Sequence, residues 1–327
     1  MKVSRQALVK WIIALAIIAG LLEALSRVGV SVKSVIEASL FAMTPLALAA
    51  LGEAVNERAG MCNVGIEGIF LLSAAIGVYG AEMFNNGYVG LLFGLVTGAL
   101  IGLLFGLLGV YCRANQVVLG MGINIFAIGF VPYFLMAEWA FPGIHIPPRE
   151  VLVTPIYTPL IRVSQVTIFA VILGFLLHYI IHKTPVGLRI KAAGETPEAL
   201  DVSGVSVEKV RLLCAVFGGA MAGLGGAFMP LAWFGGIVKE ISAGRGFIAL
   251  AVLVAAGLEP LLILVFALLF GFTEGLAYSI AVTPRVKDIV PYHVVFMIPY
   301  IVTLVVVAIF IGKARFPSAL GKPYTRE

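Results

Sequence analysis

The chain has 327 residues, of which 61% are hydrophobic and only 12% are charged. A soluble globular domain carries about 25% charged residues, so this composition excludes a soluble enzyme and a disordered chain. An outer-membrane β-barrel is excluded as well, because its strands would alternate apolar and polar residues. The net charge of +5 does not indicate nucleic-acid binding, since basic residues gather in the loops that flank membrane helices. The sequence therefore predicts an all-α, multi-pass protein of a cell membrane, surrounded by the lipid bilayer and with no nucleic-acid partner.

Ten apolar runs follow one another along the chain, and a helix needs about 20 such residues to cross about 30 Å of hydrocarbon. The runs cover residues 7–25, 35–51, 64–83, 88–110, 116–136, 166–181, 212–233, 247–256, 261–281 and 294–311. The first run follows basic residues as a signal peptide would, but ahead of so many spans we expect it to remain as a membrane helix. The eighth run is short, which indicates a tilted helix, a re-entrant segment or half of a broken helix. We expect a transmembrane helical bundle of about ten segments, with eight or nine as alternatives, in a single domain over residues 1–327.

Basic residues set the expected orientation. With a cytoplasmic amino terminus and ten crossings, fourteen lysines and arginines lie inside and eight outside, which agrees with the positive-inside rule. Both termini are then cytoplasmic. Residues 137–165 form an extracytoplasmic loop, whose five prolines favour an extended chain over a helix. Residues 182–211 form the longest cytoplasmic loop.

Residues 196–201, within this cytoplasmic loop, have the pattern of a short helix. Thr196 can cap it, Pro197 suits its first turn and Glu198 meets the positive end of its dipole. Gly204 can end the segment. A short capped helix at a membrane face predicts a binding surface, either for the membrane or for a cytoplasmic partner.

Glycines recur every three or four residues in the fourth apolar run and crowd the seventh. They are Gly90, Gly94, Gly98, Gly102, Gly106 and Gly109 in the fourth run and Gly218, Gly219, Gly223, Gly225 and Gly226 in the seventh. Glycines at such spacing leave a smooth helix face on which another helix packs closely. We therefore expect tight helix–helix contacts in both runs.

Three carboxylates lie inside apolar runs: Glu37, Glu67 and Glu274. Charges within a membrane are costly and usually functional. Glu67 and Glu274 are therefore candidates for a substrate or gating role. A structural polar network near a membrane face is the alternative for Glu67.

No catalytic or metal-binding motif stands out. The chain contains no Walker sequence, nucleophile elbow, HExxH pair or dinucleotide fingerprint. His178 and His182 are one helical turn apart, but at a helix end they are expected to reach the membrane interface rather than bind metal. Cys62, Cys112 and Cys214 have no CxxC spacing and are expected to pack as small hydrophobes. We predict no catalytic residue, no metal and no cofactor in this chain.

The stretch from Asn56 to Gly68, Asn-Glu-Arg-Ala-Gly-Met-Cys-Asn-Val-Gly-Ile-Glu-Gly, resembles a motif of a known family. The family comprises the inner-membrane permeases of ATP-binding cassette (ABC) importers of the ribose, branched-chain amino-acid and nucleoside group. The motif residues are Glu57, Arg58, Gly60, Asn63, Gly65, Glu67 and Gly68. Four further segments agree in order and spacing: Asn115–Val118 with Asn124, Thr184–Arg189 with Ala193–Ala199, Gly244–Leu250, and Ala319–Tyr324. The resemblance covers residues 45–324 and looks closest to the nucleoside branch, although Cys62 and Glu274 depart from its usual residues.

The resemblance implies a permease subunit that is not itself an enzyme. Its expected partners are a cytoplasmic ATPase that carries ATP and magnesium, a second permease chain, identical or different, and an external solute-binding protein. The family places the 182–211 loop against the ATPase, and the coupling residues are then Arg189, Gly194, Glu195, Thr196, Pro197 and Glu198. The candidates for the substrate pathway are Asn63, Glu67, Gln116, Asn124 and Glu274. Hydrogen bonds between helices are the alternative role for the three amides.

The expected solute is small and polar, most closely a nucleoside or a ribose-like sugar, and it would move by alternating access. Two other functions stay open. One is an ABC permease for branched-chain amino acids. The other is an ion-coupled secondary transporter, whose uptake would survive ATP depletion but collapse with the ion gradient.

Overall fold

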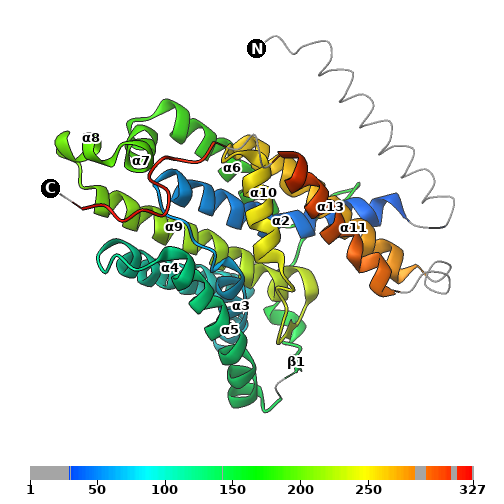
Figure 1. Cartoon of the computed structure of the whole chain (residues 1–327). Helices are drawn as coiled ribbons and strands as arrows, with labels where there is room; N and C mark the ends of the chain where they lie inside the picture. The colour runs from blue at the N-terminus through cyan, green and yellow to red at the C-terminus, as the bar shows by residue number, and fades with distance from the viewer. Residues whose placement is uncertain (1–28, 30, 142, 284–291, 311–314, 326–327) are drawn as a thin grey trace, which may run out of the picture.

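The computed structural model describes residues 29, 31–141, 143–283, 292–310 and 315–325 (Figure 1). The predicted first membrane helix, residues 7–25, lies outside the described residues. Among the described helices, seven are long and apolar enough to cross a membrane. They are α2 (Val32–Arg58), α3 (Ile66–Met83), α4 (Gly87–Val110), α5 (Gln116–Trp139), α6 (Gln165–Lys183), α9 (Val207–Phe228) with its π-helical extension η2 (Met229–Phe234), and α11 (Pro260–Val282). Two more apolar helices, α10 (Arg245–Ala256) and α13 (Tyr292–Phe310), are not among these seven.

Local sequence signals explain where most of the long helices begin. A serine or asparagine precedes each of α2, α4, α5, α6 and α9, and its side chain accepts a backbone N–H bond from the first turn. These residues are Ser31, Asn86, Asn115, Ser164 and Ser206. Such caps satisfy N–H groups that have no partner within the helix.

α2 is largely buried and packs against α6, α9, α10 and α11 (Figure 1). The predicted glycine contacts are confirmed where α4 packs on α9. A Cβ atom at Gly98 would lie 2.2 Å from the carbonyl oxygen of Gly219, and one at Gly94 would lie 2.2 Å from the Cβ of Ala227. Glycine therefore brings the two backbones into direct contact.

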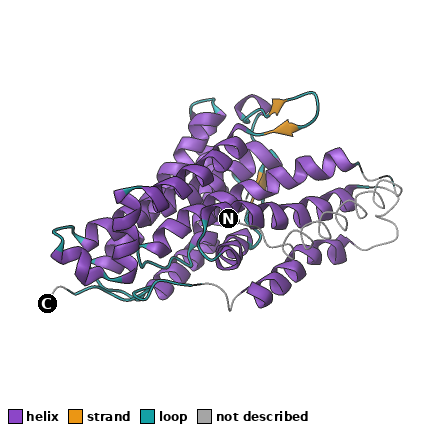
Figure 2. Cartoon of the chain, turned by 90° about the horizontal axis from the view of Figure 1, so that it is seen from above, coloured by secondary structure: helices purple, strands orange, loops and turns teal. Residues whose placement is uncertain are grey.

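The two ends of the bundle differ. One end, which we call the α7–α8 end, carries α7 (Pro185–Glu195), α8 (Pro197–Val202) and residues 315–325 (Figure 1). The other, which we call the strand end, carries β1 (Ile144–His145), η1 (Arg149–Val151), β2 (Ile156–Tyr157), β3 (Arg162–Val163) and β4 (Ile237–Val238). β1 pairs antiparallel with β4, and β2 pairs antiparallel with β3. Figure 2 shows two strands projecting from the helical body.

The structure corrects three details of the sequence analysis. Residues 182–211 are mostly helical rather than a loop, because α7 and α8 fill the interval between α6 and α9. α8 begins at Pro197 as predicted, but the Thr196 side chain does not cap it. Thr196 also ends α7, where its backbone N–H bonds to the Ala192 carbonyl oxygen. Its φ of −144° and ψ of 71° differ from the geometry of an ordinary helix cap. Cys112 is exposed rather than packed. Between Trp139, where α5 ends, and Gln165, where α6 begins, the described residues form the short strands β1, β2 and β3, the single-turn helix η1 and irregular chain rather than a long helix.

Candidate functional site

The helical path is broken between α9 and α10. η2 ends at Phe234, and Gly235 takes a left-handed φ of 69°. The chain then pairs with β1 at the strand end and turns back to start α10, after Gly244 with a φ of 78°. α10 has 12 residues, a length of about 18 Å at 1.5 Å per residue, against about 30 Å of hydrocarbon. Among the alternatives for the eighth apolar run, the geometry therefore supports half of a broken helix.

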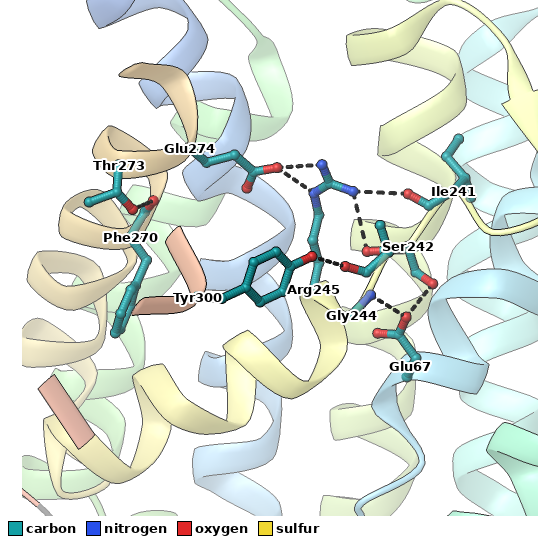
Figure 3. A network of polar contacts seen from close by, with 10 residues as sticks. Glu67, Ile241, Ser242, Gly244, Arg245, Phe270, Thr273, Glu274 and Tyr300 are labelled. Atoms are coloured by element: carbon teal, nitrogen blue, oxygen red, sulfur yellow. Dashed lines mark hydrogen bonds and ion pairs between the residues drawn. The ribbon is translucent and has the colours of Figure 1, made fainter. Parts of the chain in front are cut away.

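Glu67, in the first turn of α3, binds the first turn of α10 (Figure 3). Its Oε1 accepts the Ser242 hydroxyl at 2.5 Å and the Gly244 N–H at 2.7 Å. Its Oε2 accepts the Gly246 N–H at 2.7 Å. The first N–H groups of a helix lack partners within it and carry partial positive charge. Since Glu67 is 8% exposed, its carboxylate satisfies these groups where water has little access.

Arg245, the first residue of α10, joins this helix to α11. Its Nε donates to Glu274 Oε1 at 2.7 Å, and its Nη2 makes a second, shorter contact with the same oxygen. Its Nη1 donates to the carbonyl oxygens of Ile241 at 3.0 Å and Ser242 at 3.2 Å. Arg245 is 8% exposed and Glu274 6%. The ion pair is therefore buried. Backbone acceptors offset the cost of removing the guanidinium from water, whereas Glu274 Oε2 has no hydrogen-bond partner among the described residues.

A cavity of about 620 Å³ adjoins this network between α10, α11 and α13. Arg245, Glu274 and Tyr300 line it together with aromatic residues that include Phe234 and Tyr278. The Tyr300 hydroxyl donates to the Ala243 carbonyl oxygen at 2.7 Å (Figure 3). Three helices and the turn before α10 therefore meet at one cavity, which is lined by both charged and aromatic side chains.

A second cavity, of about 460 Å³, lies at the strand end and shares Phe234 as a wall. Glu37 and Arg162 line it, with Arg162 Nε 2.8 Å from Glu37 Oε2. The Arg162 backbone N–H also donates to Glu37 Oε1 at 3.0 Å. The hydrogen bond that Arg162 donates to the Glu37 carboxylate raises the pKa of Arg162 above its usual range. The third carboxylate found by sequence is thus an anchor for β3.

Two amide side chains of α5 bind the chain between α2 and α3. Gln116 Oε1 accepts the Cys62 N–H at 2.7 Å. Asn124 Oδ1 accepts the Gly68 N–H at 2.7 Å, and its Nδ2 donates to the Val64 carbonyl oxygen at 3.0 Å. Both amides are buried. Their bonds link helices through backbone groups of the Asn56–Gly68 motif.

Within that motif, Asn63 Oδ1 accepts the Gly65 N–H at 2.8 Å. Arg58 Nη2 donates to the Leu258 carbonyl oxygen at 3.0 Å and to Glu259 at 2.6 Å, so the motif also holds the turn between α10 and α11. Gly60 has a left-handed φ of 91°, which glycine adopts without strain. Glu57 contacts the Cys62 Sγ, and its Oε2 has no hydrogen-bond partner among the described residues.

The structure brings two of the five pathway candidates together. Glu67 and Glu274 flank Arg245 at the start of α10, whereas Asn63, Gln116 and Asn124 contact the motif backbone. Sequence reasoning missed the roles of Ser242, Arg245 and Tyr300. A signal was present for Arg245, which lies between two glycines at the start of a short apolar run.

Arg211 is a second residue whose role was missed. It is 2% exposed, and its guanidinium donates to three carbonyl oxygens: Ala59 at 3.1 Å, Ala193 at 3.1 Å and Lys322 at 2.8 Å. These acceptors belong to the end of α2, to α7 and to the carboxyl-terminal segment. One side chain therefore ties together the parts of the α7–α8 end.

The predicted coupling residues separate into an outer and an inner group. Arg189, Glu195, Thr196 and Glu198 are exposed, whereas Gly194 and Pro197 are buried. A Cβ at Gly194 would lie 2.3 Å from the Arg58 carbonyl oxygen, so α7 packs directly on the end of α2. The same end exposes the apolar residues Leu188 (70%) and Val202 (90%).

A bundle of apolar helices, one of them broken beside a cavity that a buried ion pair lines, is typical of membrane transport proteins. Residues 35–299 match the family described as "Branched-chain amino acid transport system / permease component". The chain belongs to this family of multi-pass ABC transporter permeases of the plasma membrane, as the motif resemblance predicts.

Several relatives are similar over most of their length. The guanosine ABC transporter permease protein NupQ of Bacillus subtilis is 33% identical, over 89% of this chain and 96% of NupQ. The nucleoside ABC transporter permease protein NupC of Lactococcus lactis is 30% identical, over 87% of this chain and 94% of NupC. NupB of the same organism, also named a nucleoside ABC transporter permease protein, is 26% identical over 85% of this chain and 81% of NupB. No solved structure matches.

Proposed function

We propose that this chain is the membrane-spanning permease subunit of an ABC importer for nucleosides. The observation that carries the proposal is its similarity to NupQ and NupC over nearly the whole length of each chain. A ribose-like sugar or a branched-chain amino acid is the alternative solute. In this proposal the domain spans residues 1–327, crosses the membrane about ten times and leaves both termini in the cytoplasm.

The proposed partners follow from the two ends of the bundle. A cytoplasmic ATPase, which carries ATP and magnesium, docks on the α7–α8 end through Arg189, Gly194, Glu195, Thr196, Pro197 and Glu198. Four of these residues, Arg189, Glu195, Thr196 and Glu198, are exposed and therefore available for contact with a partner. A solute-binding protein docks at the strand end, and a second permease chain, the same or different, completes the pathway.

In the proposed mechanism, ATP binding closes the ATPase dimer and moves α7 and α8. The permease pair then opens toward the binding protein and accepts the solute, and ATP hydrolysis resets it. Glu67 and Glu274 support the broken helix beside the solute route, while Asn63, Gln116 and Asn124 keep the motif segment in register with α5. The buried network around Arg245 would carry movement of α3, α11 and α13 to α10.

The test is uptake of a labelled nucleoside by proteoliposomes that contain the permease pair, the ATPase and the binding protein. We expect this uptake to require ATP. Glu198→Arg should abolish it, because the change puts a cation in place of an exposed carboxylate on the proposed ATPase-docking surface. The matched control is Glu150→Arg, an exposed glutamate at the strand end, which should still bind the ATPase. ATP-independent uptake that collapses with an ion gradient would instead identify a secondary transporter.

A further inference from the structure

Two histidines and a glutamate converge near the α7–α8 end. His178 and His182 lie one turn apart in the last part of α6, with ring centroids 4.5 Å apart. Glu259, the residue just before α11, reaches them from elsewhere in the sequence. His182 Nε2 lies 3.3 Å from Glu259 Oε2, and one ligand atom from each of the three residues lies within 4.8 Å of the other two.

The atoms around His182 and Glu259 leave one donor atom free on each. His182 Nδ1 lies 3.0 Å from the His178 backbone oxygen, which can only accept a hydrogen bond, so Nδ1 carries the proton and Nε2 of the neutral ring has a free lone pair. Glu259 Oε1 accepts from Arg58 Nη2 at 2.6 Å, which leaves Oε2 facing the histidines. Metal-binding histidines and carboxylates are oriented by such outer hydrogen bonds.

The third residue supplies an independent sign of a ligand. His178 Nδ1 is buried and has no hydrogen-bond partner among the described residues. An unsatisfied buried nitrogen is costly. The contact between His182 and Glu259 by itself leaves that cost in place, and so does a role for the histidines at the membrane interface.

We propose that His178, His182 and Glu259 form a binding site for a divalent transition metal of the zinc class. Two imidazoles and one carboxylate, with water in the fourth position, are a common tetrahedral zinc environment. Zinc–ligand bonds of about 2.0–2.1 Å place neighbouring ligand atoms about 3.3 Å apart. His182 and Glu259 already have that separation. The widest gap, 4.8 Å, closes by a small side-chain movement, and side-chain exposures of 29% for His182 and 38% for Glu259 leave room for it and for metal entry.

The bound metal would join α6 to the residue before α11 by direct bonds. α6 continues from His182 into α7, Arg58 ends α2, and Glu259 precedes α11. Arg58 and Glu259 also line a cavity of about 430 Å³ together with Lys191 and Glu195 of α7. Metal binding would therefore fix the start of α7 against the turn between α10 and α11.

The test is metal binding by the full chain, purified in detergent after removal of any histidine tag and treatment with a chelator. We expect one Zn²⁺ per chain by equilibrium dialysis and, with Co²⁺ as the probe, the intense visible absorption of a tetrahedral site. His178→Gln and Glu259→Gln should each weaken zinc binding by at least ~10-fold. His145→Gln, which alters a histidine on the strand end, is the matched control and should bind zinc like the wild type.

A second measurement protects the test against variants that fold poorly. Zinc should raise the thermal midpoint of the wild-type chain, a chelator should reverse the shift, and the two ligand variants should show no shift. The proposal is overturned if the wild type gives no tetrahedral Co²⁺ spectrum, or if His145→Gln loses zinc as fully as His178→Gln does.

Discussion

The carboxylate of Glu67 holds the first turn of α10, and Glu67→Gln tests how much of that hold is due to its charge. The native side chain accepts three hydrogen bonds, from Ser242, Gly244 and Gly246. Glutamine has the same size but only one accepting atom, and its NH2 group then faces at least one donor. Losing one charge-assisted hydrogen bond costs about 1.5–3 kcal/mol. Losing the favourable interaction with the helix dipole adds about 0.3–1 kcal/mol, so we expect a loss of about 2–4 kcal/mol.

The assay is the free energy of unfolding in mixed micelles, titrated with a denaturing detergent. Ser242→Ala removes one of the three donors and should cost less than Glu67→Gln, about 1 kcal/mol. Glu138→Gln, an exposed glutamate near the end of α5, is the matched control and should change the free energy by less than ~0.5 kcal/mol. If Glu67→Gln is no more destabilising than Ser242→Ala, the carboxylate does not hold α10 and the reasoning fails.

Three further predictions concern packing, thiol reactivity and the α7–α8 end. Gly98→Val should destabilise the chain by ~3 kcal/mol or more, because its Cβ would lie 2.2 Å from a carbonyl oxygen of α9. Gly122→Ala, with open space around it, should leave the thermal midpoint unchanged or slightly raised. Burial first, and then the nearby glutamates, raise the pKa of the Cys62 thiol to about 12. At pH 8 a maleimide should therefore label the exposed Cys112 and hardly label Cys62; equal labelling rates would contradict this. Arg211→Lys keeps the positive charge but cannot reach three carbonyl oxygens, so limited proteolysis should cut the carboxyl-terminal segment faster than in the wild type.

Features with local causes could be predicted from the sequence. The glycine spacing in the fourth and seventh apolar runs predicted close packing, and the structure has it where Gly98 meets Gly219. The short eighth run predicted a tilted helix, a re-entrant segment or half of a broken helix, and α10 is indeed short, with 12 residues. In each case the signal lies within a few turns of one helix, because helix length and the shape of a helix face depend on neighbouring residues.

Features that depend on distant segments could not be predicted in this way. Glu67 was singled out as a costly charge, but its partners at Ser242 and Gly244 are known only once α3 and the start of α10 are placed together. Arg211 counts in the sequence as one more basic residue of a loop, although it is among the largest fully buried side chains. A hydropathy scale scores an arginine by the free-energy cost of moving it out of water. It takes no account of the three carbonyl oxygens that offset this cost in the folded chain.

The charges around α10 also explain how a broken helix persists inside the bundle. Glu274 pairs with the guanidinium of Arg245, whereas Glu67 contacts the backbone at the start of α10. The amino-terminal end of a helix carries about half a positive charge, and Glu67 accepts N–H bonds at that end. The start of α10 is therefore held by side chains of α3, α11 and α13 rather than by a continuous helical backbone. Because each of these contacts is a short hydrogen bond or ion pair, a displacement of any of the three helices would move α10 with it, at the position where the helix borders the cavity.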